Sequence, residues 1–182
     1  MNRITAVSLG LFMSLTTFVA SASEAILDGK VTSKISAFII RPDNLFVTDD
    51  KGGWFDQGLP MQQTGGWDSP YEVAVRLRIT SSTGIFQVRM DNPLEIRNRR
   101  NPTQVFRDTK VSLAAEGDSS KLLAVGRNTQ FNNPPPPNED TDSVGYFTLG
   151  VSALPPTGSF KETAGDYSGE LALTFEPVAR EP

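Results

Sequence analysis

Carboxylates are the side chains in this sequence best able to do chemistry, because the chain contains no histidine and no cysteine. Those two absences exclude Cys/His zinc sites, iron–sulfur clusters, thiol nucleophiles and every histidine-based catalytic triad. Two groups of acids lie close together along the chain. One group comprises Asp43, Asp49, Asp50 and Asp56, and the other comprises Glu139, Asp140 and Asp142.

Neither acidic group has the pattern of an established carboxylate site. The first group could bind calcium, but its spacing does not match the D-x-[DN]-x-[DN]-G loop of an EF-hand. The second group could supply a general acid and base, but such a pair needs an apolar environment that raises one pKa. These acids stand in a polar, proline-rich stretch. We therefore expect solvated loop acids, no metal, no cofactor and no catalytic residue, and the chain is predicted not to be an enzyme.

A short basic run, Arg97-Asn98-Arg99-Arg100, could contact an anionic partner such as a glycan, lipopolysaccharide or DNA, with Arg89 and Arg107 nearby. The chain as a whole is acidic, because 21 Asp and Glu outnumber 17 Lys and Arg. An acidic protein is a poor nucleic-acid binder, so no nucleic-acid partner is expected. For the run itself we favour a solvated strand end or turn.

Aromatic and proline side chains offer two further binding hypotheses. Trp54, Phe55 and Trp67 stand among glycines, and exposed loop aromatics can stack on sugar rings. The alternative, which we favour, is a loop anchored by its tryptophan side chains. The run Pro134–Pro137 could recruit a polyproline-binding domain, but a stiff, protease-resistant loop is the simpler expectation.

The elements that must position these groups are predicted to be β-strands. Two segments, residues 49–69 and 127–143, are expected to be long loops, and no apolar stripe of helical spacing exceeds two turns. Many short strands separated by turn signals predict a two-sheet sandwich or a barrel. Apolar and polar residues alternate with the period of a β-strand in five runs, Tyr71–Ile79, Phe86–Met90, Val111–Ala115, Phe147–Val151 and Leu171–Phe175.

The N-terminus has the pattern of a secretory signal peptide over residues 1–22. Arg3 supplies the positive charge, an apolar stretch follows from Ile4 to Ala20, and Ala20-Ser21-Ala22 forms a small-x-small cleavage site. A membrane anchor is the alternative, but the apolar span has at most about 17 residues and lacks a basic flank. We therefore expect export and a mature chain that begins near residue 23.

The segment after the cleavage site alternates apolar or small residues with polar ones. Its polar positions are Asp28, Lys30, Thr32 and Lys34, and the fully apolar run Ala37-Phe38-Ile39-Ile40 follows. This pattern alone is compatible with one long first strand of an ordinary sandwich. The alternate positions between the polar residues are Leu27, Gly29, Val31, Ser33 and Ile35.

Three stretches resemble pilins of chaperone–usher fimbriae, in particular the CS1/CFA-I type, also called α-fimbriae. Residues Val31–Ile35 are similar to the family's V-T-A-S-[VI] segment, and residues Phe86–Leu94 to a strand that ends near a Pro-Leu pair. Residues Ala164–Phe175 look like the G-[DN]-Y-S-G-x-[LV]-x-[LVM] ending of these pilins. The resemblance implies a last strand that runs from Tyr167 to Phe175. The chain departs from the family at Ser36, where proline is frequent, and in the tail Glu176–Pro182 after that strand.

The resemblance implies an all-β fold, namely an incomplete immunoglobulin-like β-sandwich completed by a donor strand from a neighbouring subunit. Residues 1–22 would then be the signal peptide, residues 23–35 the donor strand and residues 36–182 the pilin domain. The donor side chains would be those of Leu27, Gly29, Val31, Ser33 and Ile35. The residues implied for the acceptor groove are Phe38, Ile40, Tyr167, Leu171, Leu173 and Phe175.

The function that the resemblance implies is that of a structural fimbrial subunit, exported through the periplasm to the cell surface. Its partners would be other pilin subunits, a periplasmic chaperone and an outer-membrane usher, and a host glycan is left open as a further partner. The alternative is a secreted carbohydrate-binding β-sandwich that acts as a monomer and uses Trp54 and Trp67.

Overall fold

The computed structural model describes residues 44–53, 55, 58–138 and 141–179 of the chain. The larger sheet is antiparallel and has the strand order β1-β3-β9-β6-β7, with β2 also paired to β3. Its centre is the long pair β3–β9, in which eleven consecutive residues of each strand are matched. The strands of this sheet are β1 (Leu45–Asp49), β2 (Gln62–Gln63), β3 (Tyr71–Ser81), β6 (Arg107–Ala115), β7 (Lys121–Leu122) and β9 (Ser143–Leu154).

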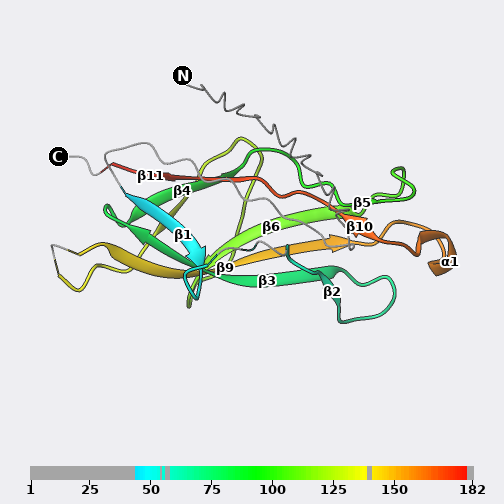
Figure 1. Cartoon of the computed structure of the whole chain (residues 1–182), viewed down its shortest axis with the longest axis horizontal. Coiled ribbons are helices and arrows are strands. Elements are labelled where there is room, and N and C mark those ends of the chain that lie inside the picture. Colours follow the sequence, from blue (N-terminus) through cyan, green and yellow to red (C-terminus); the bar gives the residue numbers. More distant parts are fainter. Residues whose placement is uncertain (1–43, 54, 56–57, 139–140, 180–182) are drawn as a thin grey trace, which may run out of the picture.

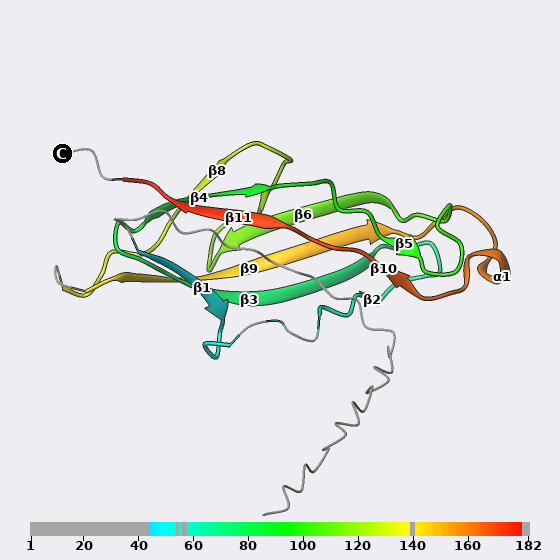
Figure 2. The ribbon, with the colours of Figure 1, turned by 45° about the horizontal axis from the view of Figure 1, so that its top comes forward.

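A second antiparallel sheet packs over the first and has the order β11-β4-β8. Figure 2 shows this sheet as a separate layer that lies across β3, β6 and β9. Its strands are β4 (Ile85–Met90), β8 (Thr129–Asn132) and β11 (Leu173–Pro177). A small third sheet joins β5 (Arg97–Asn98) to β10 (Tyr167–Ser168), near the short helix α1 (Phe160–Thr163) at one end of the sandwich.

The core lies between the two layers and is built from the alternating apolar positions of both sheets. Phe86 of β4 is fully buried at the centre, with ring centroids 5.2 Å from Phe147 and 5.7 Å from Phe131. Leu77 and Ile79 of β3 are also fully buried. Because successive strand residues point to opposite faces, the polar residues between these positions lie on the outer faces of the sandwich.

Most of the predicted strands are confirmed, because the period-two pattern is a local property of the chain. The runs at residues 71–79, 86–90, 111–115 and 147–151 lie inside β3, β4, β6 and β9 respectively. The immunoglobulin-like sandwich that these strands form is open at its sheet edges. No described helix is long and apolar enough to cross a membrane.

The prediction of one closing strand over Tyr167–Phe175 is wrong. The structure divides this stretch into β10, which pairs with β5, and β11, which begins at Leu173 and pairs with β4. The chain passes close to another backbone at Gly169, where a Cβ would lie 2.6 Å from the carbonyl oxygen of Glu95. The break therefore falls at a residue that only glycine can occupy without a shift of its neighbours.

The two predicted loops and the predicted tail also need correction. Residues 49–69 contain β2, and residues 127–143 contain β8, which pairs with β4 over four residues. The tail was expected to begin at Glu176, but β11 continues through Glu176 to Pro177. The helix α1 was not predicted, although Ser159 and Glu162 have the S-x-x-E spacing of a capping box and form one.

Candidate functional site

Strand β11 forms one edge of the smaller sheet in the described part of the chain. It pairs with β4 on one side only, and no other described strand pairs with its opposite side. Within β11, the side chains of Leu173 and Phe175 lie in the core and are 0% and 1% exposed. An apolar strand edge of this kind offers unpaired backbone groups as a template for another strand.

The antiparallel ladder decides which backbone groups of β11 point outward. Asp91 N–H donates to the carbonyl oxygen of Ala172, and Val178 N–H donates to that of Ile85. Hydrogen-bonded and non-hydrogen-bonded pairs alternate along an antiparallel ladder, so residues 174 and 176 also bond to β4. The N–H and C=O groups of Leu173 and Phe175 therefore point away from β4, toward the open edge.

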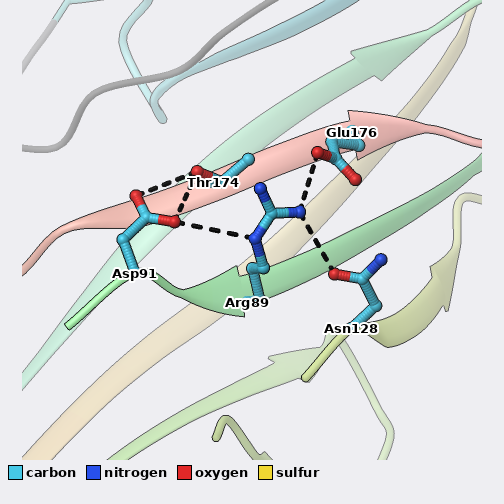
Figure 3. Close-up of polar contacts among 5 residues, drawn as sticks. All are labelled: Arg89, Asp91, Asn128, Thr174 and Glu176. Carbon is cyan, nitrogen blue, oxygen red and sulfur yellow. Dashed lines mark hydrogen bonds and ion pairs between the residues drawn. The ribbon is translucent and has the colours of Figure 1, made fainter. Parts of the chain in front are cut away.

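The outer face of β11 is attached to β4 by a cluster of polar side chains, drawn in Figure 3. Arg89 Nη1 donates to Glu176 Oε1 at 2.7 Å, and Arg89 Nε lies 3.7 Å from Asp91 Oδ1. The Thr174 hydroxyl donates to the Asp91 carboxylate, with oxygen–oxygen distances of 2.7 and 2.9 Å. Arg89 also donates to Asn128 Oδ1 at 3.3 Å. These contacts hold the last strand in its register while its other edge is open.

Strand β1 lies on the same side of the sandwich as the open edge of β11. It pairs with β3 and contacts β11, as the view in Figure 2 also indicates. The two sheets thus each present an edge strand on this side.

A pocket of about 470 Å³ opens at the α1 end of the sandwich. Its wall contains a chain of edge-on aromatic contacts in which Phe106 packs against Tyr71 and Tyr167, at 5.2 and 5.0 Å between centroids. Trp67 and Phe160 also line it and are 71% and 77% exposed. Apolar walls with exposed aromatic residues suit an apolar side chain or the face of a sugar ring.

The residues implied for the acceptor groove divide between these two features. Tyr167 and Leu171 line the pocket, whereas Leu173 and Phe175 lie in the core behind the open edge. The other two, Phe38 and Ile40, lie outside the described residues, as do all five donor residues. The assignment of donor and acceptor roles therefore stays a prediction.

The other candidate groups occupy separate positions. Arg89 lies in β4 and bonds to Glu176 of β11, whereas the basic run begins in β5, which belongs to a different sheet. In that run Arg97 forms an ion pair with Glu95, while Arg99 and Arg100 are exposed. The expected strand end or turn is thus confirmed, because β5 ends at Asn98.

The tryptophan-anchored loop is not found at Trp67, whose side chain is mostly exposed. Trp54 lies outside the described residues, so the other half of that hypothesis stays untested. Asp49 Oδ1 accepts N–H groups of Lys51 and Gly53 at 2.9 and 2.7 Å, which is a turn-stabilising role. Within the described ranges no group of three or more acids could hold a metal ion.

Sequence reasoning missed the polar cluster on the outer face of β11. A signal was present, because Arg89 and Asp91 alternate with core residues of one strand, and Thr174 and Glu176 with those of another. Complementary polar residues on the outer faces of two strands are compatible with pairing. Nothing in the sequence alone says which of the strands are neighbours.

The two packed antiparallel sheets define the fold class, an immunoglobulin-like β-sandwich. No protein-family model matches the chain, and no curated protein matches it by sequence. Among solved structures, the CooA pilin subunit from enterotoxigenic Escherichia coli is similar at a TM-score of 0.51 and 12% identity, over 75% of this chain and 99% of that one. The predicted pilin-like sandwich is confirmed by this likeness.

A second solved structure is CfaE, the adhesive subunit of CFA/I fimbria of enterotoxigenic Escherichia coli. It has a TM-score of 0.35 and 13% identity, over 67% of this chain and 45% of that one.

Proposed function

We propose that the chain is a structural subunit of a surface fimbria that polymerises by donor-strand complementation. Residues 1–22 direct export, residues 23–35 insert beside β11 of a neighbouring subunit, and residues 36–182 form the sandwich. The observation that supports this most directly is the outer edge of β11, which pairs with no other described strand and whose Leu173 and Phe175 side chains lie in the core.

An inserted strand satisfies both features of this edge. Its backbone pairs with the outward N–H and C=O groups of β11, and its alternate side chains extend the apolar core to which Leu173 and Phe175 belong. A slip of one residue would turn Lys30 and Lys34 inward, which is unfavourable because unpaired charges are costly to bury. Each subunit then donates to one neighbour and accepts from another, and such a head-to-tail contact builds a fibre.

The same edge requires protection before assembly, because an unpaired apolar strand aggregates. We therefore propose a periplasmic chaperone that covers the edge and an outer-membrane usher that delivers the subunit to the cell surface. The fold likeness to the CooA pilin subunit supports this assignment.

The test is a sheared-surface extract from cells that express the chain with its genomic neighbours. Unheated samples should migrate as a ladder of monomer multiples, and boiling should collapse the ladder to one band, because a subunit must unfold to release its donor strand. Deleting residues 23–35 should leave a folded, chaperone-bound subunit that yields no ladder. Normal fibres from that deletion would refute the proposal.

A monomeric carbohydrate-binding module is the second candidate, because Trp67 and Phe160 stand exposed at an apolar pocket. It predicts a soluble monomer without a chaperone and glycan-array signals that Trp67→Ala removes. Val125→Ala is the matched control, since Val125 is also exposed, at 47%, but lies away from this pocket. A glycan signal that survives Trp67→Ala would exclude this candidate.

A further inference from the structure

We infer that Lys30 of the incoming segment lies opposite Glu176 of β11, and that this charge pair selects the register of the subunit contact. The inference rests on the proposed function, because it specifies how one copy of the chain binds the next. It adds a charge-based choice among registers that the apolar pattern alone does not distinguish.

The outward groups of β11 restrict the possible alignments. Leu173 and Phe175 direct their N–H and C=O groups to the open edge, and the next such position, Pro177, has no N–H to offer. Only alignments that differ by two residues keep Val31 and Ile35 on the core side, because a one-residue shift reverses every side chain. Alignments shifted by two residues in either direction therefore have the same apolar pattern, and another contact must select among them.

The outer face of β11 carries a surplus of negative charge beside this edge. One guanidinium, that of Arg89, faces two carboxylates, those of Asp91 and Glu176. Thr174 donates to Asp91 but not to Glu176. Glu176 uses Oε1 for Arg89, and its Oε2 has no hydrogen-bond partner among the described residues. The side chain is 35% exposed, so a cation from a strand at the open edge can reach it.

One antiparallel alignment uses this charge. With Lys30 opposite Glu176, Thr32 lies opposite Thr174, and Val31 and Ser33 lie opposite the core residues of β11. Ile35 then comes opposite Leu171, which lines the apolar pocket at the α1 end. Gly29 falls opposite Pro177, where the absence of a side chain leaves room for the proline ring.

The two neighbouring alignments are less favourable on the same outer face. A shift in one direction places Asp28 opposite Glu176, and like charges directly opposite each other destabilise a strand pair. A shift in the other direction places Thr32 opposite Glu176 and moves Lys30 beyond it, to Val178. Among these three registers, only the proposed one brings opposite charges together at Glu176.

Engineered disulfides can test the register directly, because the chain has no cysteine of its own. In the proposed register, Thr32→Cys and Thr174→Cys form a non-hydrogen-bonded pair with Cα atoms about 4.5 Å apart, within the range that a disulfide spans. Oxidised surface extracts should give covalent oligomers on boiled, non-reducing gels. Thr32→Cys combined with Ala172→Cys, or with Glu176→Cys, reports one of the two shifted registers. Each of these combinations should give few covalent oligomers.

A second cysteine pair is the control for Thr174→Cys, which removes the hydroxyl that donates to Asp91. Asp28→Cys with Val178→Cys reports the same register and leaves the polar cluster intact. In the Thr32→Cys/Thr174→Cys background, Lys30→Gln should reduce the preference for the in-register product about two- to fivefold, the size expected of an exposed ion pair. Lys34→Gln is the matched control and should have little effect, because Lys34 lies opposite Ala172.

The outcomes separate this inference from the proposed function. A heat-sensitive ladder with cross-links only in a shifted pair, or in no pair, would overturn the register while the fibre remains. An unchanged preference after Lys30→Gln would remove the role of the charge pair. Absence of both ladder and cross-links in every variant, with a stable monomer present, would overturn the proposed function and the inference with it.

Discussion

The two sides of the sandwich are closed in different ways. On one side the chain itself crosses from the larger sheet to the smaller one, and backbone hydrogen bonds follow it across. Leu123 N–H donates to Val111 O of β6, and Met90 N–H of β4 donates to Ala124 O. The crossing segment runs from β7, an edge strand of the larger sheet, to β8, an edge strand of the smaller sheet. The chain itself therefore joins the two edge strands on this side.

On the opposite side the edges belong to β1 and β11, and among the described residues no strand fills the outer edge of β11. The same core therefore has one side linked within the chain and one side on which the outer backbone groups of β11 have no partner among the described strands. In the described part of the chain, the open edge does not result from a short strand, since β11 is longer than β7 and β8.

The largest effect is expected from filling the open side within one chain. A second copy of residues 23–35 appended after Pro182 would return antiparallel to β11. Burying Leu27, Val31 and Ile35 contributes about 1.5–3 kcal/mol each, so the free energy of unfolding in urea should rise by about 5 kcal/mol or more. An appended copy that carries Val31→Asp is the control, and equal stability of the two proteins would contradict an open apolar edge.

The next test compares one phenylalanine on each side. Phe131→Ala on the closed side should destabilise the chain by about 3–5 kcal/mol, because Phe131 packs against two rings, those of Phe86 and Phe147. Phe175→Ala should cost less, because Phe175, although buried, contacts only one ring among the described residues, that of Phe86 at 6.5 Å. Urea denaturation measures both. With the appended strand in place, the two losses of stability should become similar. A persistent difference would argue against an open edge at β11.

A smaller effect should follow from loosening β11 from β4. Thr174→Val removes the hydroxyl that donates to Asp91, and hydrogen bonds to charged groups contribute about 1.5–3 kcal/mol. Amide hydrogen exchange in β11 should accelerate along with the loss of stability. Thr148→Val, at an exposed position on the outer face of β9, is the control and should change neither.

The closed side should respond weakly to the loss of its side-chain link. Lys121 Nζ donates to Gln130 O at 2.9 Å and lies 4.9 Å from the centroid of the Phe131 ring. Lys121→Met should lower the free energy of unfolding by about 0.5–1 kcal/mol. Lys110→Met, also on an exposed strand position, is the control. A larger loss of unfolding free energy than that of Thr174→Val would mean that the closed side depends on Lys121 and not on the backbone hydrogen bonds of the crossing segment.

The smallest effect concerns α1, at the end of the sandwich and away from both sides. The Ser159 backbone N–H and the Ser159 hydroxyl both donate to Glu162 Oε2. These two bonds, the backbone bond more than the hydroxyl bond, lower the pKa of Glu162 from 4.5. A lowered pKa stabilises the folded turn above the ordinary carboxyl range, and this contribution is lost as the pH falls through the lowered value. NMR titration should give a midpoint below 4.5. Ser159→Ala should raise that midpoint, and an unchanged one would exclude the capping box as its cause.

Sequence patterns predicted the sheet strands better than the site. The alternation at Tyr71–Ile79 or Phe147–Val151 is a property of neighbouring residues and needs no knowledge of the strand partner. The short strands β2, β5 and β8 carry two to four residues each, too few for a period to be recognised. Their existence depends on the neighbours to which they pair.

The sequence by itself determined which residues turn inward on the long strands, because the period of two is encoded locally in side-chain polarity. The tertiary structure alone decided that the run Tyr167–Phe175 breaks near Gly169, and that β11 pairs with β4 and with no other described strand. It also brought Arg89 to Glu176, 87 positions along the chain. Such contacts depend on which strands become neighbours, and packing of the two layers settles that over the whole chain.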